Sequence, residues 1–269
     1  MMAYLERASV GGRIFYQVRG SGPPLVLLNG LSQSTANWTS QVTHLAERYT
    51  VITWDCRGQG RSEAGEGALD LDAHTSDLAA LLDALGHERA HLVGFSHGAR
   101  VALAFADRFP ARVDRLVVTS IGADDAPLRA VILRTWKAIL ELGGVEALAW
   151  CSTTHIMGPA FLEANVEHLE VMVKTTVQRN TEAGLRRMME AIVTYPPTLV
   201  EATRVRVPTL VVTADRDPLC SPEAGRRLTE ALPRGRHVLV EGSGHTIPVE
   251  EPRRWRDEVV AFLEGGVVG

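Results

Sequence analysis

The sequence predicts an α/β fold built on a mostly parallel, doubly wound sheet with helices on both faces. Short apolar runs of strand length alternate with segments of helical periodicity, which is typical of crossover units in a parallel sheet. This alternation stops over residues 124–203, where no convincing strand occurs. A Gly-x-Ser-x-Gly motif at residues 94–98 lies between an expected strand and an expected helix.

Composition limits the classes of protein to consider. The chain has 269 residues, of which 45% are hydrophobic and 22% charged, as in a large globular domain. Its net charge of −4 gives no reason to expect nucleic acid or a membrane surface as a partner. No apolar run approaches the roughly 20 residues of a membrane span, and residues 1–10 lack an apolar signal core. Cys56, Cys151 and Cys220 form neither a disulfide nor a metal pattern, so we expect a cytoplasmic protein.

The N-terminal half supplies most of the expected sheet. Strands are expected at residues 13–19, 25–28, 50–54, 90–93 and 113–119. The runs at 25–28 and 50–54 are almost continuously apolar, as a strand buried on both faces requires. Helices are expected at residues 38–48, 77–85 and 99–109. In the second, leucines recur at helical spacing and Gly86 ends the helix.

The C-terminal half begins with the interruption. Helical segments are expected at residues 127–142, 145–155, 159–180 and 182–195. The strand pattern returns at 207–212, followed by a helix at 222–232, a strand at 237–240 and a helix at 252–263. We therefore expect a core of residues 1–123 and 204–269, with residues 124–203 as a helical cap inserted after the strand at 113–119. Such an insert would cover the carboxyl ends of the strands, where α/β sheets bind ligands.

Ser96 has the surroundings of an activated nucleophile. A strand that turns at once into a helix forces Ser96 into a strained backbone, and Gly94 and Gly98 provide the steric room. The hydroxyl would then project above the sheet at the N-terminus of the helix. The backbone N–H of His97 would point to the place where an oxyanion forms.

Serine needs a base to act as a nucleophile, and the base needs an acid to orient it. Two carboxylates, Asp215 and Asp217, follow the strand expected at 207–212. His245 lies in a glycine-rich loop directly after the last expected strand. The chain order of Ser96, Asp217 and His245 is therefore nucleophile, acid, base.

These motifs, together with Asn29-Gly30 and the Asp-x-Arg-Gly-x-Gly-x-Ser loop at residues 55–62, resemble the α/β-hydrolase fold superfamily. Within it, the chain is most similar to the lidded esterases, enol-lactonases and cofactor-free haloperoxidases. The resemblance covers nearly the whole chain outside the insert. It implies a catalytic triad of Ser96, Asp217 and His245, and an oxyanion hole formed by the backbone N–H groups of Leu31 and His97.

The choice of acid leaves alternatives. Asp217 stands before Pro218, as the family's acid usually does, and Asp215 is then a hydrogen-bonding residue of the loop. Some relatives take the acid from the loop after the sixth strand of the family's sheet, which corresponds to the strand at 113–119 here and makes Asp124 or Asp125 the alternative. Arg57 and Arg61 could bind an anion, but the loop that holds them is more often architectural in this family.

Several side chains are candidates for the wall of a substrate pocket. They are Asn29, Trp38, His97, Trp136, Trp150 and Met157. Asn29 replaces the histidine that is usual in the family, which could alter hydrogen bonding beneath the pocket and the choice of substrate. His97 could donate to a substrate oxygen or simply form a polar wall. The three residues of the insert are as well explained by packing within the cap.

Together these residues predict a serine hydrolase that cleaves a small-to-medium ester, lactone or thioester through an acyl-enzyme, without a metal or other cofactor. The insert would cover the site, and its apolar content disfavours a highly charged substrate. We expect a monomer or a homodimer.

Other functions use the same fold and the same triad. These are a biosynthetic acyltransferase or thioesterase, a C–C hydrolase, and a cyclase or lyase; a ligand-binding, receptor-like protein is a further alternative. An acyl-carrier partner would require a basic patch near the pocket mouth, although a solvated helix face explains the insert's arginines more simply. The residues in question are Arg129, Arg134, Arg179, Arg186 and Arg187.

Overall fold

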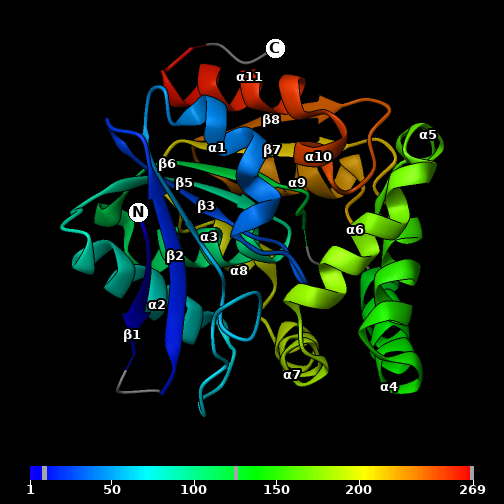
Figure 1. Cartoon of the computed structure of the whole chain (residues 1–269). Coiled ribbons are helices and arrows are strands. Elements are labelled where there is room, and N and C mark those ends of the chain that lie inside the picture. Colours follow the sequence, from blue (N-terminus) through cyan, green and yellow to red (C-terminus); the bar gives the residue numbers. More distant parts are fainter. Residues whose placement is uncertain (8–10, 124–126, 267–269) are drawn as a thin grey trace.

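The structure, a computed structural model, describes residues 1–7, 11–123 and 127–266, without the side chains of residues 127–129. Within these residues, eight strands form one sheet in the order β1-β2-β4-β3-β5-β6-β7-β8 (Figure 1). The strands are β1 (Met2–Glu6), β2 (Arg13–Arg19), β3 (Pro24–Leu28), β4 (Thr50–Trp54), β5 (Ala90–Phe95), β6 (Val113–Thr119), β7 (Thr209–Ala214) and β8 (Gly235–Val240). Pairing from β4 to β8 is parallel and only β1 and β2 run antiparallel to their neighbours, which confirms the expected sheet.

Helices cover both faces of this sheet, so the expectation of a doubly wound fold is confirmed. One face carries α2 (Leu71–Ala84), α3 (His97–Arg108), α8 (Thr198–Ala202) and α9 (Pro222–Ala231). The other face carries α1 (Thr39–Leu45) and α11 (Pro252–Leu263) (Figure 1). Three short elements complete the core, η1 (Thr35–Trp38), η2 (Pro110–Arg112) and α10 (Ile247–Glu250).

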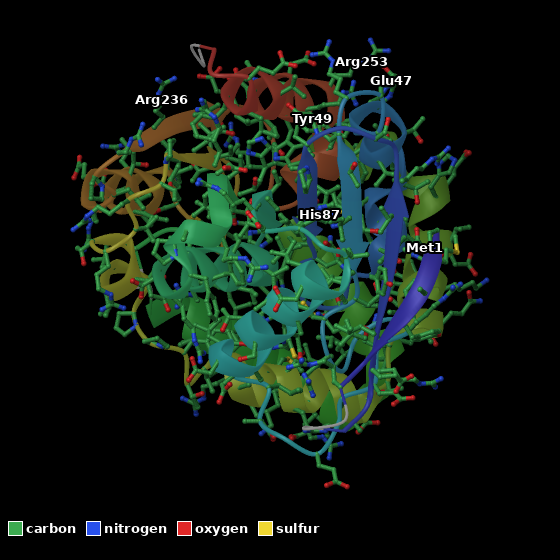
Figure 2. All side chains as sticks on the ribbon, turned by 90° about the vertical axis from the view of Figure 1, so that its left-hand side faces the viewer. Met1, Glu47, Tyr49, His87, Arg236 and Arg253 are labelled. Carbon is green, nitrogen blue, oxygen red and sulfur yellow. The ribbon has the colours of Figure 1, made fainter. Side chains whose placement is uncertain are left out.

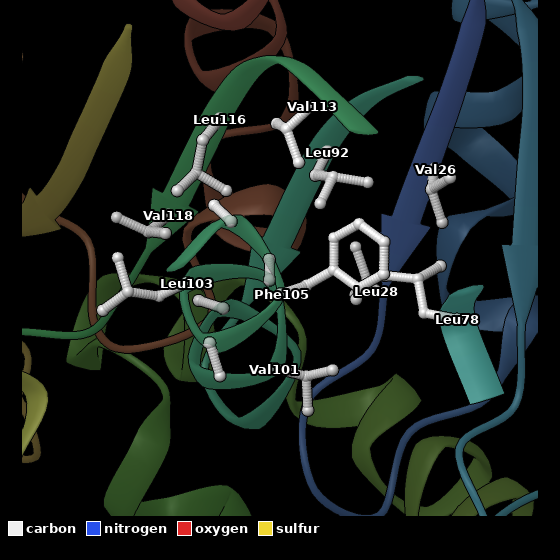
Figure 3. Packing of buried hydrophobic residues seen from close by; sticks show 14 of the residues in the cluster. Val26, Leu28, Leu78, Leu92, Val101, Leu103, Phe105, Val113, Leu116 and Val118 are labelled. Carbon is white, nitrogen blue, oxygen red and sulfur yellow. The ribbon is translucent and has the colours of Figure 1, made fainter. Parts of the chain in front are cut away.

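The two-residue period of the strands divides their side chains between two hydrophobic cores. In β3, Val26 and Leu28 pack into one core, whereas Leu25 and Leu27 pack into the other, and all four are fully buried. Figure 3 shows Phe105 of α3 pointing toward the strands that carry these residues. Full burial of such a side chain stabilises the fold by about 1.5–3 kcal/mol, so the helix that begins next to Ser96 is firmly anchored.

Strand β1 and the start of helix α2 differ from the sequence-based expectation. Strand β1 was not predicted: it lies at the edge of the sheet, pairs Met2 with Gln17, and alternates between exposed and half-buried residues. Figure 2, which looks onto this edge, shows Met1 on one side of the sheet and Arg236 of β8 toward the other. Helix α2 begins six residues earlier than expected because the Asp70 carboxylate caps the Ala73 N–H at 2.8 Å.

The segment after β6 is helical, as expected. It contains α4 (Pro127–Ile156), α5 (Pro159–Ala164), α6 (Val166–Arg179) and α7 (Glu182–Ile192), grouped at one side of the sheet (Figure 1). Gly144, with φ of 69°, breaks α4 close to the expected division between two helices. Trp136, Leu148 and Leu185 belong to a hydrophobic cluster separate from the two sheet cores. Among the described residues, no helix combines the length and apolar character needed to cross a bilayer.

Candidate active site

Ser96 occupies the sharp turn between β5 and α3. Its φ of 51° and ψ of −118° lie in a region that residues other than glycine rarely adopt. The turn brings backbone segments so close that a Cβ on Gly94 would lie 2.5 Å from the Ala99 Cα atom. A Cβ on Gly98 would lie 2.3 Å from the Leu28 carbonyl oxygen. The two glycines of the motif are therefore steric requirements of the turn.

His245 and Asp217 approach Ser96 from the loops after β8 and β7. The Nε2 atom of His245 lies 2.9 Å from the Ser96 Oγ atom, and its Nδ1 atom lies 2.8 Å from the Asp217 Oδ2 atom. Asp217 and His245 are both buried. The second carboxylate oxygen of Asp217 accepts hydrogen bonds from the N–H groups of Leu219 and Cys220 at 2.7 and 3.0 Å. These bonds fix the carboxylate against the imidazole.

Of the other carboxylates considered from the sequence, Asp215 does not join this arrangement. Asp215 is exposed and accepts the Gly242 N–H at 2.6 Å, on the loop before His245. Asp124 and Asp125 lie outside the described residues. The structure therefore brings Asp217, and not Asp215, into contact with His245.

The hydrogen bonds define which imidazole nitrogen carries the proton. A carboxylate accepts hydrogen bonds only, so the Nδ1 atom of His245 donates to Asp217. In the neutral imidazole, Nε2 is then the acceptor and faces the Ser96 hydroxyl. This tautomer can take a proton from serine, as general-base catalysis requires.

Leu31 follows β3 and lines the space above Ser96. His97 is the first residue of α3, so its backbone N–H is one of those that have no acceptor within the helix. Both residues expected to form an oxyanion hole are thus at the carboxyl ends of neighbouring strands, β3 and β5.

Two cavities, as far as the described residues define them, meet at Ser96, with volumes of about 460 and 250 Å³. The residues common to both walls are Leu31, Ser96, Trp136, Leu219 and His245. His97 lines the larger cavity and Met157 the smaller. Much of both walls comes from the helices that follow β6.

Three residues predicted to line the pocket do not line either cavity. The Asn29 amide is fully buried, where it donates to the Trp54 carbonyl oxygen at 2.9 Å and accepts from the Trp38 indole at 2.5 Å. Trp38 is buried against Trp255, with ring centroids 5.7 Å apart. Trp150 lies on the outer side of α4 and is 40% exposed. The sequence could not reveal on which side of these elements each side chain lies.

His97 forms a polar wall of the larger cavity. The Tyr195 hydroxyl donates to the Leu69 carbonyl oxygen at 3.1 Å, so it accepts from the His97 Nε2–H at 3.0 Å. Burial lowers the pKa of His97 well below its usual value, and the neighbouring His74 and Arg100 act in the same direction. His97 is therefore neutral, and its N–H is engaged by Tyr195 rather than free for a substrate oxygen.

Arg100 and Tyr195 line this cavity but were not singled out from the sequence. Arg100 is buried on α3, one turn after Ser96, and forms an ion pair with Glu201 at 2.6 Å. The sequence did contain one sign of a role for Arg100, because it is a charged residue inside an otherwise apolar helical segment. Tyr195 carried no comparable signal, because its position depends on how the segment after α7 folds back onto α3.

Arg57 of the 55–62 loop has an architectural role, as the family resemblance implied, whereas the Arg61 side chain is exposed, with its guanidinium 4.7 Å from the Phe15 ring centroid. Arg57 is buried and pairs with Asp77, in part through a 2.7 Å hydrogen bond. The Asp55 carboxylate accepts the backbone N–H groups of Thr35 and Arg61 at 2.5 and 2.9 Å. These bonds tie the loop to η1.

The arginines of the insert have different surroundings. Arg186 pairs with Glu182 on the same helix. Arg187 donates to the carbonyl oxygens of Gly65 and Gly67 at 2.9 and 2.7 Å. Of the rest, Arg134 is exposed, Arg179 lines the smaller cavity, and the side chain of Arg129 lies outside the described residues.

Comparison with known proteins places this geometry in a family. A model of the alpha/beta hydrolase fold matches residues 23–155, and a model described as TAP-like protein matches residues 191–268. The chain is 30% identical, over 244 residues, to a Pseudomonas syringae pv. syringae protein with the provisional name carbamate hydrolase RutD; the match covers 90% of this chain and 93% of that protein. The chain belongs to the α/β-hydrolase fold family. This confirms the resemblance seen in the sequence, and the protein is an enzyme of the hydrolase class.

Two further relatives of this α/β hydrolase are enol-lactonases. The 3-oxoadipate enol-lactonase 2 of Acinetobacter baylyi is 27% identical over 245 residues, which covers 90% of this chain and 89% of that protein. The crystal structure of the enol-lactonase from Burkholderia xenovorans LB400 superposes with a TM-score of 0.87 at 25% identity, covering 97% of this chain and all of that chain. The likeness therefore includes the helical segment after β6 as well as the sheet.

Proposed function

We propose that this α/β hydrolase is a serine hydrolase that cleaves a small-to-medium ester, lactone or thioester. The observation that carries the proposal is the continuous chain of hydrogen bonds from Asp217 through His245 to Ser96, at 2.8 and 2.9 Å. A buried carboxylate, an oriented imidazole and a hydroxyl in this order make serine nucleophilic at neutral pH.

In the proposed reaction, the Ser96 oxygen attacks the acyl carbonyl carbon while His245 Nε2 takes the hydroxyl proton. Asp217 holds the imidazole in place and stabilises the imidazolium that forms. The backbone N–H groups of Leu31 and His97 donate to the oxyanion. Collapse of the tetrahedral intermediate releases the leaving oxygen or sulfur, which takes the proton from His245. Water, deprotonated by His245, then attacks the acyl-enzyme and regenerates Ser96.

The two cavities support a substrate with groups on either side of the scissile bond. Their volumes of about 460 and 250 Å³ fit small-to-medium groups, and both walls are largely apolar. We propose that residues 124–203 act as a cap that supplies these walls, including Trp136 and Met157. The names of the relatives add carbamates and enol-lactones to the esters and thioesters that should be screened.

The first test is intact-mass spectrometry after treatment with a fluorophosphonate. We expect one adduct on the wild type, no adduct on Ser96→Ala, and much slower labelling of His245→Ala. Ser152→Ala is the matched control, because Ser152 lines the smaller cavity but makes no contact with His245 in the described structure. A folded wild type without an adduct, or equal labelling of Ser96→Ala, would contradict the proposal.

A further inference from the structure

The carboxylate of Glu250 joins the loop that carries His245 to the helices after β6. Its Oε2 atom accepts the backbone N–H of Gly244 at 2.7 Å and that of Gly158 at 2.9 Å. Its Oε1 atom accepts the Thr246 N–H at 3.0 Å and the Thr246 hydroxyl at 2.7 Å. Glu250 therefore binds both chain neighbours of His245 and the residue that precedes α5.

The two segments that Glu250 joins are also in direct backbone contact. The His245 N–H donates to the Ile156 carbonyl oxygen at 2.6 Å. A Cβ on Gly244 would lie 2.4 Å from the Gly158 nitrogen, and a Cβ on Gly158 would lie 2.9 Å from Glu250 Oε2. The contact therefore requires glycine at position 244, and a side chain at position 158 would displace the Glu250 carboxylate.

The backbone of His245 is held from a second direction by the core. The Ser120 hydroxyl, at the end of β6, donates to the His245 carbonyl oxygen at 2.7 Å. The backbone at His245 is thus fixed on three sides. Its N–H is bound by the helical segment after β6, its carbonyl oxygen by the core, and the two neighbouring residues by Glu250. A displacement of about 1 Å in such a group can reduce a reaction rate about 100-fold.

We propose that Glu250 is a positioning residue that aligns His245 with Ser96 and makes this alignment depend on docking of the α4–α5 junction. The inference rests on the proposed function, in which His245 is the general base. Hydrogen bonds to an ionised carboxylate are stronger than neutral ones, so this carboxylate can hold the two backbone segments together. When the α4–α5 junction moves away, Gly158 leaves the carboxylate and His245 loses the bond to Ile156.

Two kinds of variant test this role. Glu250→Ala removes all four hydrogen bonds, whereas Glu250→Gln keeps the shape but turns one acceptor oxygen into a donor that faces an N–H group. Gly158→Ala disturbs the same contact from the other side and leaves Glu250 intact. Glu251→Ala is the matched control, because Glu251 is the next residue along the chain and is exposed.

The measurements are kcat and KM with an ester found in the screen, and the rate of fluorophosphonate labelling, each normalised to folded protein. We expect Glu250→Ala to lower kcat and the labelling rate about 10- to 100-fold, with KM changed by less than about twofold because the cavity walls remain. Glu250→Gln and Gly158→Ala should fall between Glu250→Ala and the wild type, and Glu251→Ala should match the wild type. A structural role alone would lower the melting temperature and leave kcat per folded molecule unchanged.

Hydrogen exchange provides a readout that does not depend on activity. In Glu250→Ala we expect faster exchange in peptides covering residues 243–246 and also in peptides covering 156–160. Equal kcat in Glu250→Ala and Glu251→Ala, or faster exchange in the loop alone, would overturn the inference. Failure of the wild type to label at Ser96 would instead overturn the proposed function, and the exchange data would then still decide whether Glu250 couples the two segments.

Discussion

The side-chain amide oxygen of Asn29, Oδ1, accepts the indole N–H of Trp38 at 2.5 Å, and neither residue lines the two cavities at Ser96. The amide group of Asn29 also donates to the Trp54 carbonyl oxygen at 2.9 Å. Asn29 therefore connects the end of β3 to the end of β4 and to η1. This position explains how an asparagine supports the loop that carries Leu31 without contacting a ligand.

We predict that Asn29→Ala lowers stability more than it affects substrate binding. The change leaves the Trp38 indole and the Trp54 carbonyl buried without partners, which should cost about 1–3 kcal/mol of unfolding free energy for each lost partner. Urea unfolding measures this loss. Asn165→Ala is the control, because Asn165 is only half-buried and its amide makes one bond, to the Phe161 carbonyl oxygen. An unchanged stability with a strongly raised KM would mean that Asn29 belongs to the pocket after all.

The turn at Ser96 gives a second prediction. Gly98→Ala should prevent the turn from closing, because the new Cβ would lie 2.3 Å from the Leu28 carbonyl oxygen, and backbone cannot move aside cheaply. We expect loss of soluble protein or a destabilisation above about 3 kcal/mol. Gly67→Ala is the matched control, since Gly67 is exposed with no atom within 4 Å of its Cβ position. The expression yield and thermal unfolding of Gly98→Ala and Gly67→Ala are compared with those of the wild type. Near-wild-type stability of Gly98→Ala would be incompatible with this geometry.

The sheet was predictable because its strands carry strong local signals. The run at residues 25–28 is apolar at every position, and β3 is buried on both faces as that pattern requires. Strand β1 lies at the edge, half exposed, and its composition differs little from that of a loop. Helix α2 extends six residues beyond the leucine pattern that predicted it, to the cap at Asp70, a residue type that favours helix N-termini.

The three residues of the expected triad were predictable from the sequence because each of them lies in the turn or loop after a strand. Ser96, Asp217 and His245 each follow a strand, and parallel strands bring their carboxyl ends to one edge. Side-chain direction was not predictable: Trp136 and Trp150 occur in the same helix, yet one lines the cavities and the other is 40% exposed. Glu250 was missed because three of its four hydrogen-bond partners are backbone N–H groups, which the sequence does not display.

His74 yields a prediction about pH. Burial lowers the pKa of His74 to about 4, Arg57 acts in the same direction, and Asp77 and Asp70 oppose it. The unfolded chain binds this proton near pH 6.5, so between about pH 6.5 and 4 the unfolded state carries more protons. Stability therefore falls as the pH is lowered through this window, and His74 accounts for about 2 kcal/mol of the loss between pH 7 and 5.

The measurement for His74 is urea unfolding at pH 7 and pH 5. In His74→Gln, whose side chain does not titrate, the difference in unfolding free energy between the two pH values should shrink by about 2 kcal/mol. The same comparison on His44→Gln provides the control, because His44 is exposed. A pH difference in His74→Gln as large as that of the wild type would show that His74 binds its proton equally well in the folded and the unfolded protein.

Trp136 should control substrate size. Its side chain lines both cavities, so Trp136→Ala would join them into a larger space. We expect the preference among esters of increasing acyl length to shift toward longer chains, with kcat/KM for the shortest ester reduced about tenfold as packing against it is lost. Trp150→Ala is the control, since Trp150 is outside both cavity walls. A shift in Trp150→Ala, or none in Trp136→Ala, would reverse the assignment of the two tryptophans.

Asp217 and Asp215 provide the sharpest comparison, because they are two residues apart on the same loop. Asp217→Asn replaces the acceptor of the His245 Nδ1–H by a group that can favour the opposite tautomer, so we expect kcat to fall about 10⁴-fold. Asp215→Asn removes the charge from a hydrogen bond with the Gly242 N–H and from an ion pair with Arg216 at 3.4 Å, neither of which contacts His245, so kcat should stay within about threefold of the wild type. The rates of ester cleavage, measured on folded protein, test both. If Asp215→Asn were the more damaging change, or if Asp217→Asn kept most of its activity, the acid would have to come from elsewhere in the chain.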